Sequence, residues 1–347
     1  MTETKKKTNV ARELAVVFFV LLLLITFTAA SSELLTPKRY DYGATWGQYL
    51  EEPENSLDVL FFGSSITYCD VVPAVIWEKS GVASYVMAGP EQTVPISYYY
   101  IREACKTQSP QAVFLEVTGV FFERYQNFTK VNVGYMPYGS NRLGAAFHAS
   151  EREELTGLLF PLYNYHSRFD RLTQEDFAIV LWGYGQDDFA GYTFLDTAAE
   201  IDGVQPRGET LDEENYARNI EYLRKIAEFC RQEDIKPVFY IAPTCLSLSD
   251  EHLSMLKSDI EAIDGVSFID FNSDEYSTDY DLQRDYYDLL HFNCYGAEKF
   301  SAQLGKLMTG TLGIRADSGS DDALWLQRLE SFNARVQASS ASAQSAS

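Results

Sequence analysis

Two short segments near opposite ends of the chain contain the side chains of a candidate nucleophilic site. Ser65 follows an apolar run in LDVLFFGSSITYCD, and YYDLLHFNCYGAEKF holds Asp288 and His291 in an Asp-x-x-His spacing. On a turn, a carboxylate three residues before a histidine can accept the imidazole Nδ1–H and leave Nε2 to take a proton from a serine. The alternative is that Gly63-Ser64-Ser65 is a turn that only caps the next helix. An Asp-x-x-His spacing alone is a weak signal, but together with Ser65 it favours a Ser-His-Asp triad.

The elements that must position these residues are short apolar runs separated by amphipathic stretches. The runs are LDVLFFG (57–63), ASYVMAG (83–89), QAVFLEV (111–117), KPVFYIA (236–242) and VSFIDF (266–271). The helix candidates are residues 73–80, 93–107, 212–233, 249–263 and 295–313. Continuous rather than alternating apolar runs are typical of parallel strands covered on both faces. The pattern predicts an α/β fold with a doubly wound, flavodoxin-like sheet of about five parallel strands. Ser65 would lie at the carboxyl edge of this sheet.

The remaining segments complete the expected domain organisation. Residues 118–210 are rich in Tyr, Phe, Gly and Arg and are too long for a simple loop. We expect a helical insertion after the third strand that caps the carboxyl edge, where open α/β sheets bind ligands. Residues 32–55 look like a polar connector, and 56–315 form the main domain. Residues 316–347 are expected to contain a helix over 323–336 and then a disordered, low-complexity tail.

The N-terminus has the pattern of a membrane anchor. A basic start at residues 1–12 is followed by LAVVFFVLLLLITFTAA, which carries no charge and is about the shortest length that spans a bilayer. We predict a signal anchor over residues 13–31 in the cell membrane, with 1–12 in the cytoplasm and the rest outside it. The alternatives are a long signal peptide, cleaved near Thr28-Ala29-Ala30, and a buried core helix.

Composition excludes several other classes of function. The net charge is −22, which repels nucleic-acid backbones, and no Lys/Arg stripe interrupts the acidic surface. The five cysteines have no CxxC spacing, and the pairs Asp187-Asp188 and Asp321-Asp322 are better explained as solvated surface than as metal ligands. No glycine-rich nucleotide loop occurs. We therefore expect no nucleic-acid partner, no metal and no organic cofactor.

These residues resemble the motifs of the SGNH/GDSL hydrolase superfamily over about residues 56–313, apart from the insertion. FFGSSIT (61–67) is similar to the nucleophile block of that family, and DLLH (288–291) to its acid–base block. The resemblance implies that Ser65 is the nucleophile, Asp288 the orienting acid and His291 the base.

Ser64 stands where the family commonly has Asp, which makes the chain look closest to the membrane-anchored branch. That branch includes D-alanyl-transfer and alginate O-acetylation proteins. The resemblance implies an acyl ester of a surface or cell-wall glycan as substrate. For a transferase, it implies an integral-membrane acyltransferase as partner.

The same resemblance implies a set of oxyanion donors. These are the backbone N–H groups of Ser65 and Gly89, with Ala88 as the neighbouring candidate. The third block of the family, Gly-x-Asn-Asp, is missing, because the third apolar run continues as LEVTGVFF. The third donor is therefore absent or comes from Gln92, Thr118 or the insertion. Loss of one donor costs about 10²–10³ in rate, which favours a slow, specific acyl-transfer enzyme or an inactive descendant over a general esterase.

Within the insertion, His166 and Arg168 form a polar cluster that could contact an anionic glycan. The alternative is a structural histidine and a salt bridge. The aromatic residues of WGYGQDDFAGYTF (182–194) stack on sugars or pack in the interior. Two hypotheses of different classes remain: a membrane-anchored serine acyl hydrolase or O-acyltransferase, and a non-catalytic scaffold protein with the same fold. A secreted lipase is disfavoured by the anchor and the acidic body, which anionic lipid repels.

Overall fold

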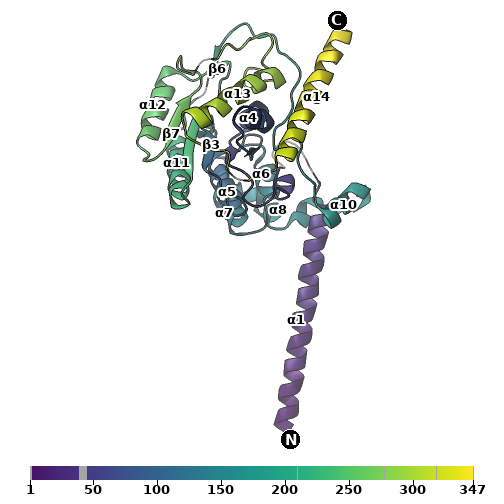
Figure 1. Cartoon of the computed structure of the whole chain (residues 1–347). Coiled ribbons are helices and arrows are strands. Elements are labelled where there is room, and N and C mark those ends of the chain that lie inside the picture. The colour runs from purple at the N-terminus through teal and green to yellow at the C-terminus, as the bar shows by residue number, and fades with distance from the viewer. Residues whose placement is uncertain (1, 39–44, 209, 277, 318, 347) are drawn as a thin grey trace. The chain divides into compact units, whose positions relative to one another are not determined.

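The structure is a computed structural model that describes residues 2–38, 45–208, 210–276, 278–317 and 319–346 (Figure 1). The chain divides into two compact units. The smaller consists of Met1–Arg39 with Glu153–Gly183, and the larger of Tyr40–Arg152 with Tyr184–Ser347.

The larger unit is built on one parallel sheet. Its strands are β1 (Val59–Phe62), β2 (Ser84–Val86), β3 (Ala112–Glu116), β5 (Lys236–Ile241) and β7 (Ser267–Asp270), in the order β2-β1-β3-β5-β7. All neighbouring strands pair in parallel. This is the flavodoxin-like order, so the predicted fold class is confirmed. Every residue of β1, β2 and β3 is buried, which explains why their sequences are continuously apolar.

Two groups of helices accompany this sheet (Figure 1). In one group, α13 (Cys294–Gly310) packs against α3 (Ser65–Asp70) and α4 (Pro73–Ser80). In the other, α11 (Glu213–Gln232) packs against α5 (Val94–Ala104) and α12 (Asp250–Glu261). Each predicted helix candidate coincides with one of these elements within a few residues. A second, two-stranded sheet of β4 (Gln205–Pro206) and β6 (Leu246–Ser247) lies outside the predicted elements.

The expected connector over 32–55 is wrong in its second half. The short helix α2 (Trp46–Tyr49) belongs to the core of the larger unit, because Trp46 and Tyr49 are fully buried. Glu52 is also buried, and its carboxylate forms an ion pair with Arg328. The folded body therefore includes residues 45–55, which lie before its expected start at residue 56.

The expected disordered tail is also corrected. Helix α14 (Asp322–Ala346) continues well beyond residue 336. Its first half is fixed to the body, because Trp325, Arg328 and Phe332 are buried and the helix packs against α4. Alanine has the highest intrinsic helix propensity, so an Ala-rich stretch can extend a helix that packing has already nucleated.

The insertion is helical, as predicted, but it is divided between the two units. Its elements are η1 (Thr118–Phe121), α6 (Thr129–Gly134), α7 (Ser140–His148), η2 (Arg152–Glu154), α8 (Leu155–Leu159), α9 (Pro161–Tyr165), η3 (His166–Arg171) and α10 (Gln174–Trp182). The part from α8 to α10 belongs to the smaller unit, together with α1 (Thr2–Leu35). Contacts of α1 with α9, η3 and α10 hold this unit together.

Helix α1 is long and apolar enough over Val10–Leu35 to cross a membrane. None of its most apolar stretch is buried inside the protein, which argues against the core-helix alternative.

Candidate active site

The three side chains of the predicted triad are joined by hydrogen bonds. Ser65 is the first residue of α3, and its Oγ is 2.8 Å from His291 Nε2. On the other side of the ring, His291 Nδ1 is 2.9 Å from both carboxylate oxygens of Asp288. The His291 side chain is 16% exposed and that of Asp288 is 46% exposed, so the arrangement is open to solvent. This is the geometry in which a carboxylate fixes the imidazole tautomer and Nε2 accepts the serine proton.

The Asp-x-x-His turn is shaped by the same carboxylate that holds the ring. Asp288 Oδ1 accepts the backbone N–H of Leu290 at 2.7 Å and that of His291 at 2.9 Å. Burial raises the pKa of Asp288, but its bond to His291 and these two N–H groups outweigh burial and bring the pKa below its usual value. Asp288 is therefore an ionised acceptor at neutral pH.

Gly63 determines how the chain leaves β1 toward Ser65. Its φ is +150°, a value that L side chains rarely adopt. A Cβ at this position would lie 2.2 Å from Thr67 Oγ1 and 2.9 Å from Glu116 Cβ. Only glycine fits, so the Gly-Ser-Ser turn is a consequence of close packing between α3 and the end of β3. The N–H of Ser65 opens α3, where the first N–H groups of a helix have no intrahelical partner.

The expected oxyanion role of Gly89 needs correction. The Gly89 N–H donates to Gly63 O at 3.4 Å, and two residues earlier Met87 N–H donates to Phe61 O at 2.7 Å. The ladder between β1 and β2 thus continues past the ends of the strands and uses the N–H that the resemblance assigned to the oxyanion. The neighbouring candidate, Ala88, is fully buried.

The two side chains proposed as replacement donors are also engaged. Thr118 donates its hydroxyl to Glu116 Oε2 at 2.9 Å and its backbone N–H to Oε1 at 3.1 Å, so both donors already have an acceptor. Gln92 Nε2 donates to Ser97 Oγ at 3.0 Å. The Gln92 amide lies beside Gly89, because its Oε1 is 3.1 Å from the position of a Cβ on that glycine. That buried oxygen has no hydrogen-bond partner in the described part of the chain.

Sequence reasoning missed an asparagine that the insertion brings next to Gly89. Asn132 on α6 is fully buried, and its Oδ1 is 2.2 Å from the position of a Cβ on Gly89. Its Nδ2 donates to Pro90 O at 2.9 Å, whereas Oδ1 has no partner within the described ranges. Asn132 lies in a region without strand or helix periodicity, so no sequence signal identified it.

Two buried carboxyl groups beside the site were also missed. Burial raises the pKa of Glu116 to about 7, against the opposing effects of Arg207 and of the bonds from Thr118. Burial likewise raises the pKa of Asp70 well above its usual value, although Phe292 N–H donates to its Oδ1 at 2.9 Å. An acidic residue inside an otherwise apolar run is a sequence signal for a buried carboxyl group. Glu116 and Asp70 each lie inside an apolar run.

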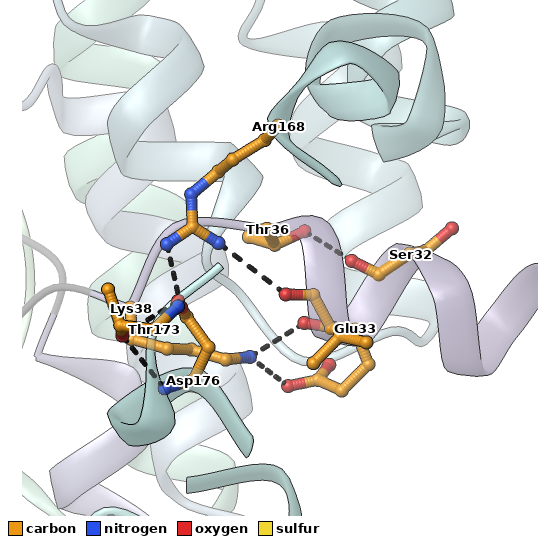
Figure 2. Close-up of polar contacts among 8 residues, drawn as sticks. Ser32, Glu33, Thr36, Lys38, Arg168, Thr173 and Asp176 are labelled. Carbon is orange, nitrogen blue, oxygen red and sulfur yellow. Dashed lines mark hydrogen bonds and ion pairs between the residues drawn. The ribbon is translucent and has the colours of Figure 1, made fainter. Parts of the chain in front are cut away.

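The remaining predicted site residues, His166 and Arg168, lie in the smaller unit, whereas the triad lies in the larger one. Arg168 forms a salt bridge with Asp176 at 2.7 Å and donates to Leu34 O at 3.5 Å (Figure 2). His166 Nδ1 contacts two carbonyl oxygens of its own helical segment. The structural alternative therefore describes both residues, and we leave them out of the site.

The described residues contain no group of three or more His, Cys, Asp or Glu side chains that is arranged to hold a metal ion. The five cysteines, Cys69, Cys105, Cys230, Cys245 and Cys294, are all unpaired thiols, four of them buried.

Comparison with known proteins gives little beyond this geometry. No family model matches the chain, and no curated protein matches it significantly. Among solved structures, the chain is similar to a Bacteroides fragilis protein described as a "putative acylhydrolase", with a TM-score of 0.40 and 13% sequence identity. The match covers 79% of this chain and 100% of that protein.

Proposed function

We propose that this protein is a membrane-anchored serine acyl hydrolase or O-acyltransferase that acts outside the cytoplasm on an acyl ester, most simply an acetyl ester, of a surface glycan. One observation carries the proposal: the sequence of contacts from Ser65 Oγ to His291 Nε2 at 2.8 Å and from His291 Nδ1 to Asp288 at 2.9 Å. A serine attacks an ester only when a base removes its proton, and this arrangement provides that base together with the group that orients it.

In the first half-reaction, Ser65 Oγ attacks the ester carbonyl carbon and its proton passes to His291 Nε2. Asp288 accepts the Nδ1–H and stabilises the imidazolium that forms. When the tetrahedral intermediate collapses, the bond to the sugar oxygen breaks and His291 returns the proton to that oxygen. The products are a free sugar hydroxyl and an acyl group on Ser65.

In the second half-reaction, His291 removes a proton from water or from another sugar hydroxyl, and the oxygen of that molecule attacks the acyl carbon on Ser65. The bond between the acyl carbon and Ser65 Oγ then breaks, and His291 returns the proton to the serine oxygen. Water makes the protein a hydrolase and a sugar makes it a transferase. The triad is the same for both, so the outcome depends on whether water is excluded when the acceptor is bound. As a transferase, the protein would receive acyl groups through an integral-membrane acyltransferase, in keeping with an anchor at Val10–Leu35.

The oxyanion donors bear on the rate that we expect. Two of the predicted donors, the Gly89 N–H and the Thr118 hydroxyl, are bonded elsewhere. Each missing donor typically costs about 10²–10³ in rate. We therefore expect slow turnover. The same observation favours a second candidate function, a non-catalytic scaffold of a glycan-modification system.

The experiment is labelling of the full chain in detergent with a fluorophosphonate probe, which reacts with activated serines. Wild type is compared with Ser65→Ala, His291→Ala and Ser64→Ala. Ser64 makes no side-chain capping bond to α3, so its variant is the matched control. The proposal expects labelling that is lost in Ser65→Ala and His291→Ala and kept in Ser64→Ala. No labelling of a folded wild-type chain would favour the scaffold function instead.

Release of acyl groups from an acetylated glycan, and their transfer to an added sugar, then separates hydrolase from transferase. Free acetate without acylated acceptor identifies a hydrolase. Acylated acceptor that requires Ser65 identifies a transferase.

A further inference from the structure

Exposed apolar side chains concentrate in one short segment of the smaller unit. Outside α1, fifteen large apolar residues are exposed among the described residues, and seven of them lie between residues 160 and 182. They are Phe160, Tyr163, Phe169, Phe177, Val180, Leu181 and Trp182. Trp182 is 83% exposed and Phe169 is 71% exposed. A soluble surface scatters such residues singly, whereas a cluster of this kind marks an interaction surface.

Helix α10 presents most of this surface on one side. Its Asp176 and Ile179 are buried, while Phe177, Val180 and Leu181, at positions i, i+3 and i+4, are exposed. The helix is held firmly at its start by a capping box between Thr173 and Asp176. Its apolar face is therefore displayed by an ordered element that leaves it without a partner inside the unit.

The segment is attached to the end of the membrane-spanning helix. Helix α1 packs against α9, η3 and α10, all within the smaller unit. Figure 2 shows the polar contacts at this junction: Arg168 bridges Asp176 and the carbonyl of Leu34, and Lys38 Nζ bonds both the carbonyl and the carboxylate of Glu33. On the side of α1 these contacts involve Glu33 and Leu34, close to the end of the apolar stretch Val10–Leu35, and Lys38 just after it. The segment that carries the exposed aromatic side chains is therefore attached near the C-terminal end of α1.

We propose that residues 160–182 form a second membrane contact, an interfacial collar that lies in the headgroup region of the bilayer spanned by α1. Trp, Tyr and Phe side chains favour this region, because an apolar ring enters the acyl boundary while polar groups remain hydrated. Arg171, two residues after Phe169, is exposed and lies 3.9 Å from the equally exposed Asp170, and a long basic side chain can reach headgroups while its stem stays in apolar surroundings. Lipid is the occupant that the structure favours, because the surface is continuous with the end of an unburied apolar span.

The collar goes beyond the proposed catalytic function and does not depend on it. It gives the chain two attachments to the membrane. The spanning helix fixes the protein to the bilayer, and the collar restricts how the end of α1 tilts in it.

The test uses tryptophan fluorescence of the full chain in vesicles made of phosphatidylcholine and phosphatidylglycerol, a fraction of which carries bromine near the top of the acyl chains. Helix α1 contains no tryptophan, so the anchor gives no signal. Of the four tryptophans, Trp46 and Trp325 are 1% exposed, and Trp182 is the exposed one of the set. The difference between wild type and Trp182→Phe therefore reports on Trp182.

We expect brominated lipid to quench wild type and to leave Trp182→Phe nearly unchanged, with Trp77→Phe quenched like wild type as the matched control. Acrylamide dissolved in the water should quench the fluorescence of Trp182 in the vesicle-bound protein severalfold less than it quenches a tryptophan that is exposed to water. A second variant, Phe169→Trp in the Trp182→Phe background, should restore quenching by lipid from another position of the collar.

Equal responses of wild type and Trp182→Phe to brominated lipid, with full access of acrylamide to Trp182 in vesicles, would overturn the proposal. Because these vesicles hold no other protein, that result would mean that lipid does not cover the surface. The surface would then be assigned to a protein partner.

Discussion

Replacement of Glu116 by Gln should reduce the loss of stability that the protein shows as the pH rises from about 5 to 8. Glu116 lies at the end of β3, 2% exposed and packed beneath Gly63. Burial raises the pKa of its carboxyl from 4.5 to about 7. Because the folded-state pKa is the higher one, the folded protein binds the proton more tightly than the unfolded chain does. The stability from this group is complete below the ordinary pKa and is lost as the pH rises through about 7.

The size of the effect follows from those two pKa values. Over the window from about pH 5 to pH 8, a shift of this size lowers the free energy of unfolding by about 2.5 kcal/mol. In Glu116→Gln the amide oxygen still accepts the Thr118 N–H, and the Thr118 hydroxyl can accept from the amide N–H. Both bonds with Thr118 can therefore be kept while the titration disappears, and the variant should gain stability over wild type mainly at the upper end of this pH window.

The assay is urea unfolding of the full chain in detergent micelles, followed by near-UV circular dichroism at several pH values. Glu54→Gln is the control, because Glu54 is exposed and its replacement removes the same single negative charge. The expected result is a pH dependence that is reduced by about 2.5 kcal/mol in Glu116→Gln and unchanged in Glu54→Gln. Parallel curves for wild type and Glu116→Gln would refute the reasoning, because they would mean that Glu116 does not change protonation on unfolding in this window.

Other substitutions test the site and its supports. Asp288→Asn should lower the rate of fluorophosphonate labelling by about 10⁴, because the amide no longer fixes the required tautomer, with an unchanged melting temperature as control. Gly63→Ala should destabilise the protein by about 1–3 kcal/mol or more in chemical denaturation, because of the φ of +150° and because a Cβ would collide with Thr67 and Glu116. Unchanged stability would contradict this close packing. Arg328→Met should cost about 3–5 kcal/mol by leaving Glu52 buried without its partner, and adding Glu52→Met should recover most of the loss. Asp70→Ala should lower labelling more than Asp70→Asn does, because asparagine keeps an oxygen that accepts the Phe292 N–H. Equal losses in the two variants would point to a role for the charge of Asp70 instead.

The sheet and its helices could be predicted because their signals are local. Continuous apolar runs identified every strand of the main sheet. The long helix α11 was predicted from acidic residues in its first turn and from apolar residues, now seen to be buried, on one side. The errors concern segments that pack through distant partners. Nothing near Glu52 in the sequence indicates that it pairs with Arg328, 276 residues later. This pair connects the segment after α2 with α14. Likewise, α9, η3 and α10 contain no signal that they pack against α1.

The candidate site divides in the same way. The spacing of Asp288 and His291 is local, so their hydrogen bond could be expected from the sequence, but the approach of Ser65 to His291 joins residues 226 positions apart. The structure supplies a reason for that approach. Asp70, one turn after Ser65 on α3, accepts the N–H of Phe292, the residue that follows His291, at 2.9 Å. A carboxyl group buried in an apolar interior is costly unless it is bonded, so its pairing strongly favours one position of the histidine loop relative to α3. The residue whose bond favours the approach of His291 to Ser65 is therefore one that the spacing of the candidate residues could not reveal.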